Sequence, residues 1–120
     1  MLKRWRTSRN ALTKGDIWLV NLPETVGNEQ YGTRPAIILA EIIRYLLAVI
    51  VPITKNMKTA DAPFTTVIQP NSRNGLSVPS VALGLQIRAV DKSRLLRKLG
   101  VLDSADLSAI DAELKAMLQV

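Results

Sequence analysis

The sequence predicts a small, mainly β domain, a strongly bent β-barrel that ends in a helix. Short apolar runs rich in β-branched residues recur between turn-forming residues over the first three quarters of the chain. A longer segment near the C-terminus has helical spacing instead. Almost half of the 120 residues are hydrophobic and the charged fraction is ordinary, which indicates a globular fold rather than disorder. At this length a single domain is expected.

The predicted strands are short and are bounded by glycine, proline and asparagine. They cover residues 17–22, 36–40, 48–54, 65–69 and 77–90. The segment 41–47 fits either a helical turn or a continuation of the strand on either side of it. Asn74-Gly75 is a turn pair suited to positive φ, and the last strand segment is expected to bend at Gly84.

Around Asp91 the spacing of the apolar residues changes to that of a helix. Residues 92–100 are predicted to form a short basic helix closed by Gly100. Residues 102–120 form the clearest predicted helix, which Asp103 or Ser104 would cap. Its apolar stripe is expected to pack in the core or in a dimer rather than to contact a cofactor, and it consists of Leu107, Ile110, Leu114 and Met117.

The composition restricts the partners and the chemistry. A formal net charge of +6 favours a polyanionic partner, nucleic acid before membrane, and no apolar run approaches the roughly 20 residues that span a bilayer. The absence of cysteine excludes disulfides and thiol chemistry and suits a reducing cytoplasm. The absence of histidine removes the commonest general base and metal ligand. Any catalysis is therefore expected to use carboxylates, hydroxyls, arginine, lysine, tyrosine or backbone amides, with no metal and no cofactor.

The basic N-terminus is expected to be an arm outside the folded domain. Residues 1–14 carry five basic residues and no acidic residue, and residues 15–120 form the predicted domain. Such an arm either contacts nucleic acid or a partner, or is a solvated terminus without fixed structure.

Arg34 and Thr54 form a candidate functional pair. Arg34 precedes Pro35 at the start of one predicted strand, and the proline keeps it out of the helical region. Thr54 ends the next strand. If the two strands pair, a guanidinium and a hydroxyl would project from one face, which suits a phosphate group. The alternative is a structural ion pair of Arg34 with Glu29 or Glu41.

Several blocks of sequence, in order, resemble the MazF/PemK/Kid toxins. They are GDIWLV (15–20), TVGNEQYGTRPA (25–36), VPIT (51–54), GLS (75–77), SVAL (80–83), QIRAVD (86–91) and KLG (98–100). The resemblance implies the toxin of a bacterial type II toxin–antitoxin system, with a compact SH3-like barrel and a homodimer. It also implies sequence-specific cleavage of single-stranded RNA, chiefly messenger RNA. A cognate antitoxin would block the RNA groove with an acidic, flexible segment.

The resemblance also implies roles for individual residues. Arg34 and Thr54 match the family's catalytic pair, and Glu29 matches a glutamate that assists activity in some members. RNA is cleaved without metal when its 2′-hydroxyl attacks the adjacent phosphate and leaves a 2′,3′-cyclic phosphate. Glu29 is the nearby carboxylate candidate for the base. Seven further side chains are candidates for lining an RNA groove: Gln30, Tyr31, Lys55, Asn56, Lys58, Arg73 and Arg88.

The chain departs from the family at Leu85. Many members carry an acidic or polar residue directly before the glutamine that is Gln86 here. Catalysis is therefore expected to be weaker, to rest on Glu29, or to be absent. Two other functions stay open: a poison of DNA gyrase, as in the related CcdB toxins, and a degenerate member that binds RNA without cutting it. The presence of Arg34 and Thr54 argues against the gyrase poison.

Overall fold

The computed structural model describes residues 12–23, 27 and 30–120. That part of the chain forms seven strands and one α-helix. They are β1 (Asp16–Leu22), β2 (Gly32–Ile42), β3 (Leu47–Thr54), β4 (Thr65–Ile68), β5 (Ser80–Leu83), β6 (Arg88–Asp91), β7 (Leu95–Val101) and α2 (Ser104–Leu118). Four short 3₁₀ turns connect them: η1 (Ile43–Tyr45), η2 (Met57–Asp61), η3 (Gly84–Gln86) and η4 (Lys92–Arg94). No helix in these ranges is long and apolar enough to cross a membrane.

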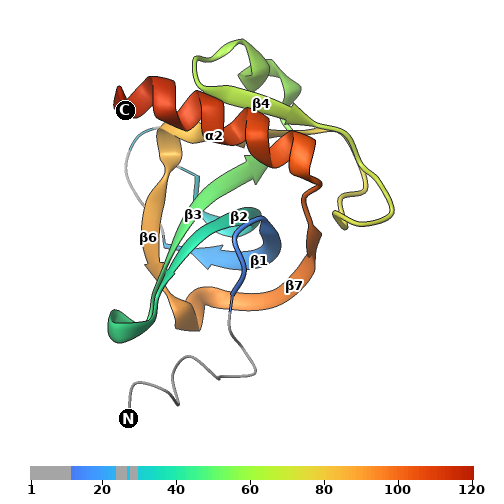
Figure 1. Ribbon diagram of the computed structural model, residues 1–120. Helices are drawn as coiled ribbons and strands as arrows, with labels where there is room; N and C mark the ends of the chain where they lie inside the picture. The colour runs from blue at the N-terminus through green and yellow to red at the C-terminus, as the bar shows by residue number, and fades with distance from the viewer. Residues whose placement is uncertain (1–11, 24–26, 28–29) are drawn as a thin grey trace.

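The described strands form one antiparallel sheet in the order β4-β5-β3-β2-β1-β7, with β6 added beside β3. The sheet curls strongly around the core, and α2 lies across it on the β4 side (Figure 1). This confirms the predicted mainly β fold with a C-terminal helix. The barrel is not closed, because β4 and β7 remain the two ends of the strand order.

Strand β3 changes partners along its length. Leu47–Pro52 pairs with β2, and Leu47–Ile50 also pairs with β6 on the other side. Ile53 and Thr54 pair instead with β5. The end of β3 therefore diverges from β2, which becomes important for the site.

The ambiguous segment 41–47 contains both of the predicted structures. Strand β2 continues through Ile42, the 3₁₀ turn η1 follows, and Leu46 adopts a left-handed φ of 55° before β3 begins. The segment thus forms the tip of the β2–β3 hairpin.

The predicted basic helix over 92–100 is wrong. Only Lys92–Arg94 makes a 3₁₀ turn, and Leu95–Val101 is strand β7, antiparallel to β1. Leucine, lysine and arginine favour a helix locally, but pairing with β1 and packing of Leu95 against an apolar cluster outweigh that preference. Gly100 is required for another reason: a Cβ there would lie 2.2 Å from the carbonyl oxygen of Arg73.

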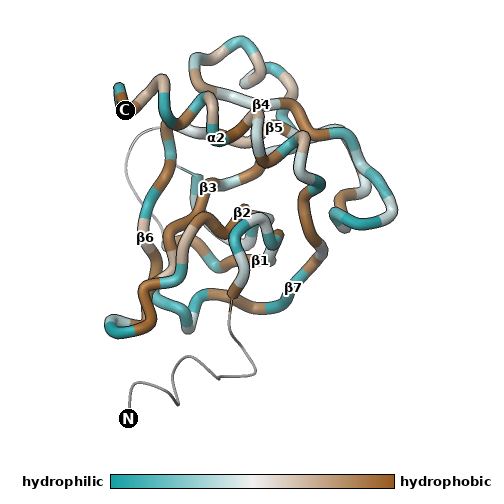
Figure 2. Tube along the Cα trace, in the orientation of Figure 1, coloured by the Kyte–Doolittle hydropathy of each residue, from teal (hydrophilic) through white to brown (hydrophobic). Residues whose placement is uncertain are grey.

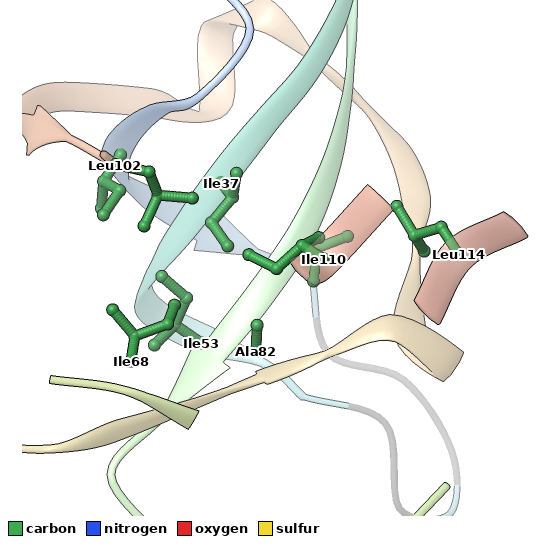
Figure 3. Packing of buried hydrophobic residues seen from close by; sticks show 9 residues of the cluster. Ile37, Ile53, Ile68, Ala82, Leu102, Ile110 and Leu114 are labelled. Atoms are coloured by element: carbon green, nitrogen blue, oxygen red, sulfur yellow. The ribbon is translucent and has the colours of Figure 1, made fainter. Parts of the chain in front are cut away.

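The core lies on both faces of the central strands, which are the most hydrophobic part of the trace (Figure 2). On one face Ile37, Ile53 and Ile68 meet Ile110 and Leu114 of α2 (Figure 3). The predicted helix stripe is therefore core: Ile110 and Leu114 are buried, and its other two members pack against the same cluster. The other face buries a second cluster, including Val20, Leu22, Ile38, Ile50 and Val90.

The helix cap follows the prediction. The Asp103 carboxylate accepts a hydrogen bond of 2.9 Å from the backbone N–H of Asp106. This satisfies one of the orphan donors at the start of α2.

Candidate functional site

Arg34 and Thr54 lie at the same end of the β2–β3 pair. Ala36 pairs with Pro52 at the end of that ladder. Arg34 stands two residues before Ala36, and Thr54 stands two residues after Pro52. The predicted pairing of their strands is confirmed, and both residues lie where β3 leaves β2 to join β5.

A cavity of about 290 Å³ opens at this divergence; we call it the basic pocket. Arg34 and Lys55 line one part of it, and the loop segment 75–78 together with Leu99 lines another. Its lining also contains hydroxyl groups of serine and threonine, and the described lining residues include two cations and no carboxylate. This donor-rich, positively charged surface suits a phosphate group.

The guanidinium of Arg34 is oriented by the backbone before it. Its Nε–H donates to the carbonyl oxygen of Tyr31 at 3.2 Å. This bond does not use the two terminal nitrogens of the guanidinium, which form the fork for bidentate anion binding. The alternative partner Glu41 is engaged elsewhere, since its carboxylate accepts from the backbone of Leu12 and pairs with Lys92.

Thr54 is 7% exposed, and its hydroxyl oxygen accepts a hydrogen bond of 3.2 Å from the backbone N–H of Asn56. Because the hydroxyl acts as acceptor in this bond, its own hydrogen remains able to donate. Thr54 does not itself line the basic pocket, although Ile53 and Lys55 on either side of it do. The structure thus brings Arg34 and Lys55 together and places Thr54 beside them.

Asn56, the residue after Lys55, lines a second cavity of about 430 Å³, which we call the amide pocket. Its polar lining includes the side-chain amide residues Gln30, Asn56 and Gln86. The rest is mostly apolar and includes Leu83 and Leu85. Lys55 and Asn56 therefore line the two cavities in succession.

The chain that leads into Arg34 is held by residues that follow β5. The backbone N–H of Gln30 donates to Oε1 of Gln86 at 2.6 Å, and the Arg88 guanidinium donates to the carbonyl oxygen of Gln30 at 2.5 Å. Arg88, predicted to bind RNA, thus also orders the start of this segment. Gln86 lines the site but was not among the predicted residues; its place in the sequence directly after Leu85 was the available signal.

Three other predicted residues line neither cavity. Tyr31 is 55% exposed, Lys58 is exposed on η2, and Arg73 is exposed on the turn before Gly75. Glu29 lies outside the described residues. Within them, no group of three or more histidine, cysteine, aspartate or glutamate residues could hold a metal ion.

These features define a small curled β-sheet protein with a cationic pocket at a strand divergence, a class suited to bind a phosphodiester. Residues 13–118 match the family described as PemK-like, MazF-like toxin of type II toxin-antitoxin system, and the chain belongs to this family. Endoribonuclease MazF9 of Mycobacterium tuberculosis is 30% identical over 117 residues, which cover 91% of this chain and 98% of that protein. Endoribonuclease EndoA of Bacillus subtilis is 33% identical over 108 residues, covering 88% and 92%.

The fold agrees with solved structures of the same family. MazF (Form-I) from Deinococcus radiodurans superimposes with a TM-score of 0.73 at 27% identity and covers 89% of this chain and 96% of that one. MazE-MazF (Form-II) from the same organism gives a TM-score of 0.66 at 26% identity, covering 89% and 95%.

Proposed function

We propose that this protein is an endoribonuclease, the toxin of a type II toxin–antitoxin system, that cuts single-stranded RNA in the bacterial cytoplasm without a metal ion. Membership of the toxin family supports this, as do relatives that are named endoribonucleases. The observation that carries it is the basic pocket: Arg34 and Lys55 line one cavity, and Thr54 is the residue before Lys55 in the chain.

The reaction divides between the RNA and these side chains. The 2′-oxygen forms a bond to the adjacent phosphorus, the bond from phosphorus to the 5′-oxygen breaks, and a 2′,3′-cyclic phosphate results. The guanidinium of Arg34 stabilises the negative charge that develops on the phosphoryl oxygens, and Lys55 adds a second positive charge. Thr54 donates a hydrogen bond to a phosphoryl oxygen or positions the 2′-hydroxyl.

The two proton transfers need a base and an acid. Glu29 is proposed to take the proton from the 2′-hydroxyl, because it is a carboxylate five residues before Arg34 in the sequence and carboxylates serve as general bases. The 5′-oxygen takes up a proton from water as it leaves. Replacing Glu29 with glutamine is therefore expected to slow cleavage while leaving RNA binding intact.

The proposed protein partner is an antitoxin with an acidic, flexible segment. The net charge of +6 and the cations of the basic pocket complement such a segment, which would cover the residues that hold RNA. The functional unit is proposed to be a homodimer, which light scattering of the purified protein tests.

The test is incubation of the purified protein with long single-stranded RNA in EDTA, with mapping of the fragment ends. Arg34→Ala and Thr54→Ala are each expected to lower the rate by about 100-fold or more, the usual effect of removing a group that stabilises the transition state. Arg97→Ala, at an exposed arginine of β7, is the matched control and is expected to cut normally.

Each outcome separates the candidate functions. Cuts that end in cyclic phosphate and disappear in both site variants support the proposal. Intact RNA despite salt-sensitive binding would leave a non-cleaving RNA binder. Cutting that survives both substitutions would mean that the reaction occurs elsewhere.

A further inference from the structure

We propose that the amide pocket holds one unpaired nucleobase of the RNA next to the cut, and that Leu85 forms the apolar wall on which this base stacks. The inference rests on the proposed function, because it assigns the base-reading part of the same site. The pocket would thereby determine one position of the cleavage sequence.

The chemistry of the lining differs sharply between the two cavities. The basic pocket has two cations, whereas none of the described residues that line the amide pocket is charged. Its polar groups include three side-chain amides, and each amide offers a donor and an acceptor as the edge of a base does. Its apolar residues suit the flat faces of a base. A neutral, planar ligand with a hydrogen-bonding edge therefore fits this cavity better than a phosphate does.

The relative position of the cavities matches the layout of a nucleotide. Lys55 lines the basic pocket and the next residue, Asn56, lines the amide pocket. The backbone N–H of Asn56 also donates to the hydroxyl of Thr54. A phosphate held by Arg34 and Lys55 would thus have its own or the neighbouring base beside Asn56.

Two side-chain amides of the lining carry atoms suited to hydrogen-bond such a base. Oε1 of Gln30 is buried and has no hydrogen-bond donor within the described part of the chain. An unsatisfied buried acceptor costs roughly 1–3 kcal/mol, so rotation of this side chain to meet a base N–H in the cavity would relieve the cost. Oδ1 of Asn56 already accepts from the backbone of Lys58, and that bond does not use its Nδ2 donors. One acceptor and one donor are the minimum needed to read a base edge.

The walls of the amide pocket are fixed by backbone contacts. The N–H of Gly84 donates to the carbonyl oxygen of Phe64 at 3.0 Å, and a Cβ at Gly84 would lie 2.4 Å from that oxygen. Phe64 itself has a left-handed φ of 60°. The hydroxyl of Thr65 donates to the carbonyl oxygen of Ala62 at 3.0 Å. A preorganised wall discriminates between ligands because it does not adapt to the wrong one.

Leu85 supplies an exposed apolar side chain to the lining of this pocket. Its side chain is 56% exposed at the cavity although it is apolar. Covering it with a base removes apolar surface from water, worth about 25 cal/mol for each Å². Leu85 is thus assigned to stacking rather than to proton transfer.

The test compares the cleavage preferences of Leu85→Trp and the wild type on a library of random single-stranded RNA. The indole fills the cavity, so the preference for one base next to the cut is expected to fall at least 10-fold. Leu96→Trp is the matched control, because Leu96 is 52% exposed on β7 and lines neither cavity. If the wild type cuts RNA and Leu85→Trp keeps the same preference as Leu96→Trp, the inference is overturned.

A binding measurement separates failure of this inference from failure of the proposed function. The four nucleoside 3′-monophosphates are titrated into wild-type protein labelled at its leucine methyl groups, and the methyl resonances of Leu85 and Leu96 are followed by NMR. Selective shifts at Leu85 with one base support the pocket even if the protein cuts no RNA. Shifts at neither leucine, or equal shifts with all four monophosphates, overturn the inference even if the protein does cut.

Discussion

Replacing Asn74 with alanine is expected to cost about 2–4 kcal/mol of unfolding free energy. The side chain is fully buried. Its Oδ1 accepts from the backbone N–H groups of Asn71 at 3.2 Å and Leu76 at 3.0 Å, and its Nδ2 donates to the carbonyl oxygen of Gln69 at 2.9 Å. Alanine leaves three backbone groups without a partner, each worth roughly 1–3 kcal/mol when buried. The total cost lies near the low end of this range, because the residues that carry the three backbone groups are exposed or half-buried, so water reaches some of these groups.

The assay is urea unfolding of both proteins with the slope held common, which converts the shift in midpoint into a free energy. Asn21→Ala is the matched control, because Asn21 is exposed on β1. Its hydrogen bond with Arg94 uses the backbone carbonyl oxygen, which alanine keeps. An Asn74→Ala protein within about 0.5 kcal/mol of this control, the range of ordinary surface changes, would refute the reasoning. Cleavage should also fall, since Asn74 fixes the loop that continues into the wall of the basic pocket.

Three further changes test other parts of the structure. Gly84→Ala is expected to lower the melting temperature and to disturb the amide pocket, because its Cβ would strike the Phe64 carbonyl. Glu41→Gln should cost about 1.5–3 kcal/mol in urea unfolding, because this carboxylate is 9% exposed and pairs with Lys92. Asp91→Asn should flatten the fall in stability below about pH 4, since hydrogen bonds from Ser93 lower the pKa of Asp91 below its ordinary value of 3.8.

Each of these changes has its own control. Asn21→Ala, an exposed change on β1, serves again as the control for Gly84→Ala, and an equal fall in melting temperature in the two variants would contradict the contact with Phe64. Lys14→Ala removes an exposed ion pair with Asp111 and should cost less than about 1 kcal/mol. Burial and the charge of Asp103 raise the pKa of Asp106, so Asp106→Asn should shift the acid dependence in the opposite direction to Asp91→Asn.

For Asp91 the sign follows from proton binding. A carboxyl whose pKa is lower in the folded state than in the unfolded state stabilises the fold above the unfolded pKa. That contribution disappears as the pH falls through the folded pKa, because the unfolded chain then binds more protons. A variant whose stability falls as steeply as that of the wild type below pH 4 would contradict the role assigned to this carboxyl.

The parts of the fold that were predictable are those whose signal is local. The strand at 17–22 and the helix stripe ending at Met117 follow from apolar periodicity, which reports burial directly. Strand β7 was mistaken for a helix because its pairing with β1 involves the opposite end of the chain. Gly100 was interpreted as a helix cap for the same reason, whereas it allows contact with the backbone of Arg73. Both errors concern contacts between residues that lie too far apart in the sequence to fall within one local window.

The same distinction applies to the site. Arg34 and Thr54 were identifiable because a proline and a strand end fix their positions, and the structure sets both at one end of a strand pair. The facing walls of the two cavities were not predicted, since Leu99 and Leu85 reach them only through the curl of the sheet. The hydrogen bond of Arg88 to Gln30 was equally hidden, because 58 residues separate the two.

The divergence of β3 from β2 has a consequence for the synthesis of the protein. The basic pocket that forms there takes residues from β1, from β2 and, through Leu99, from β7. A ribosome therefore makes Arg34 and Thr54 well before it makes the strand that completes their surroundings. Since such a domain folds as a unit once its partner strands exist, the nascent chain carries no finished pocket during most of its synthesis.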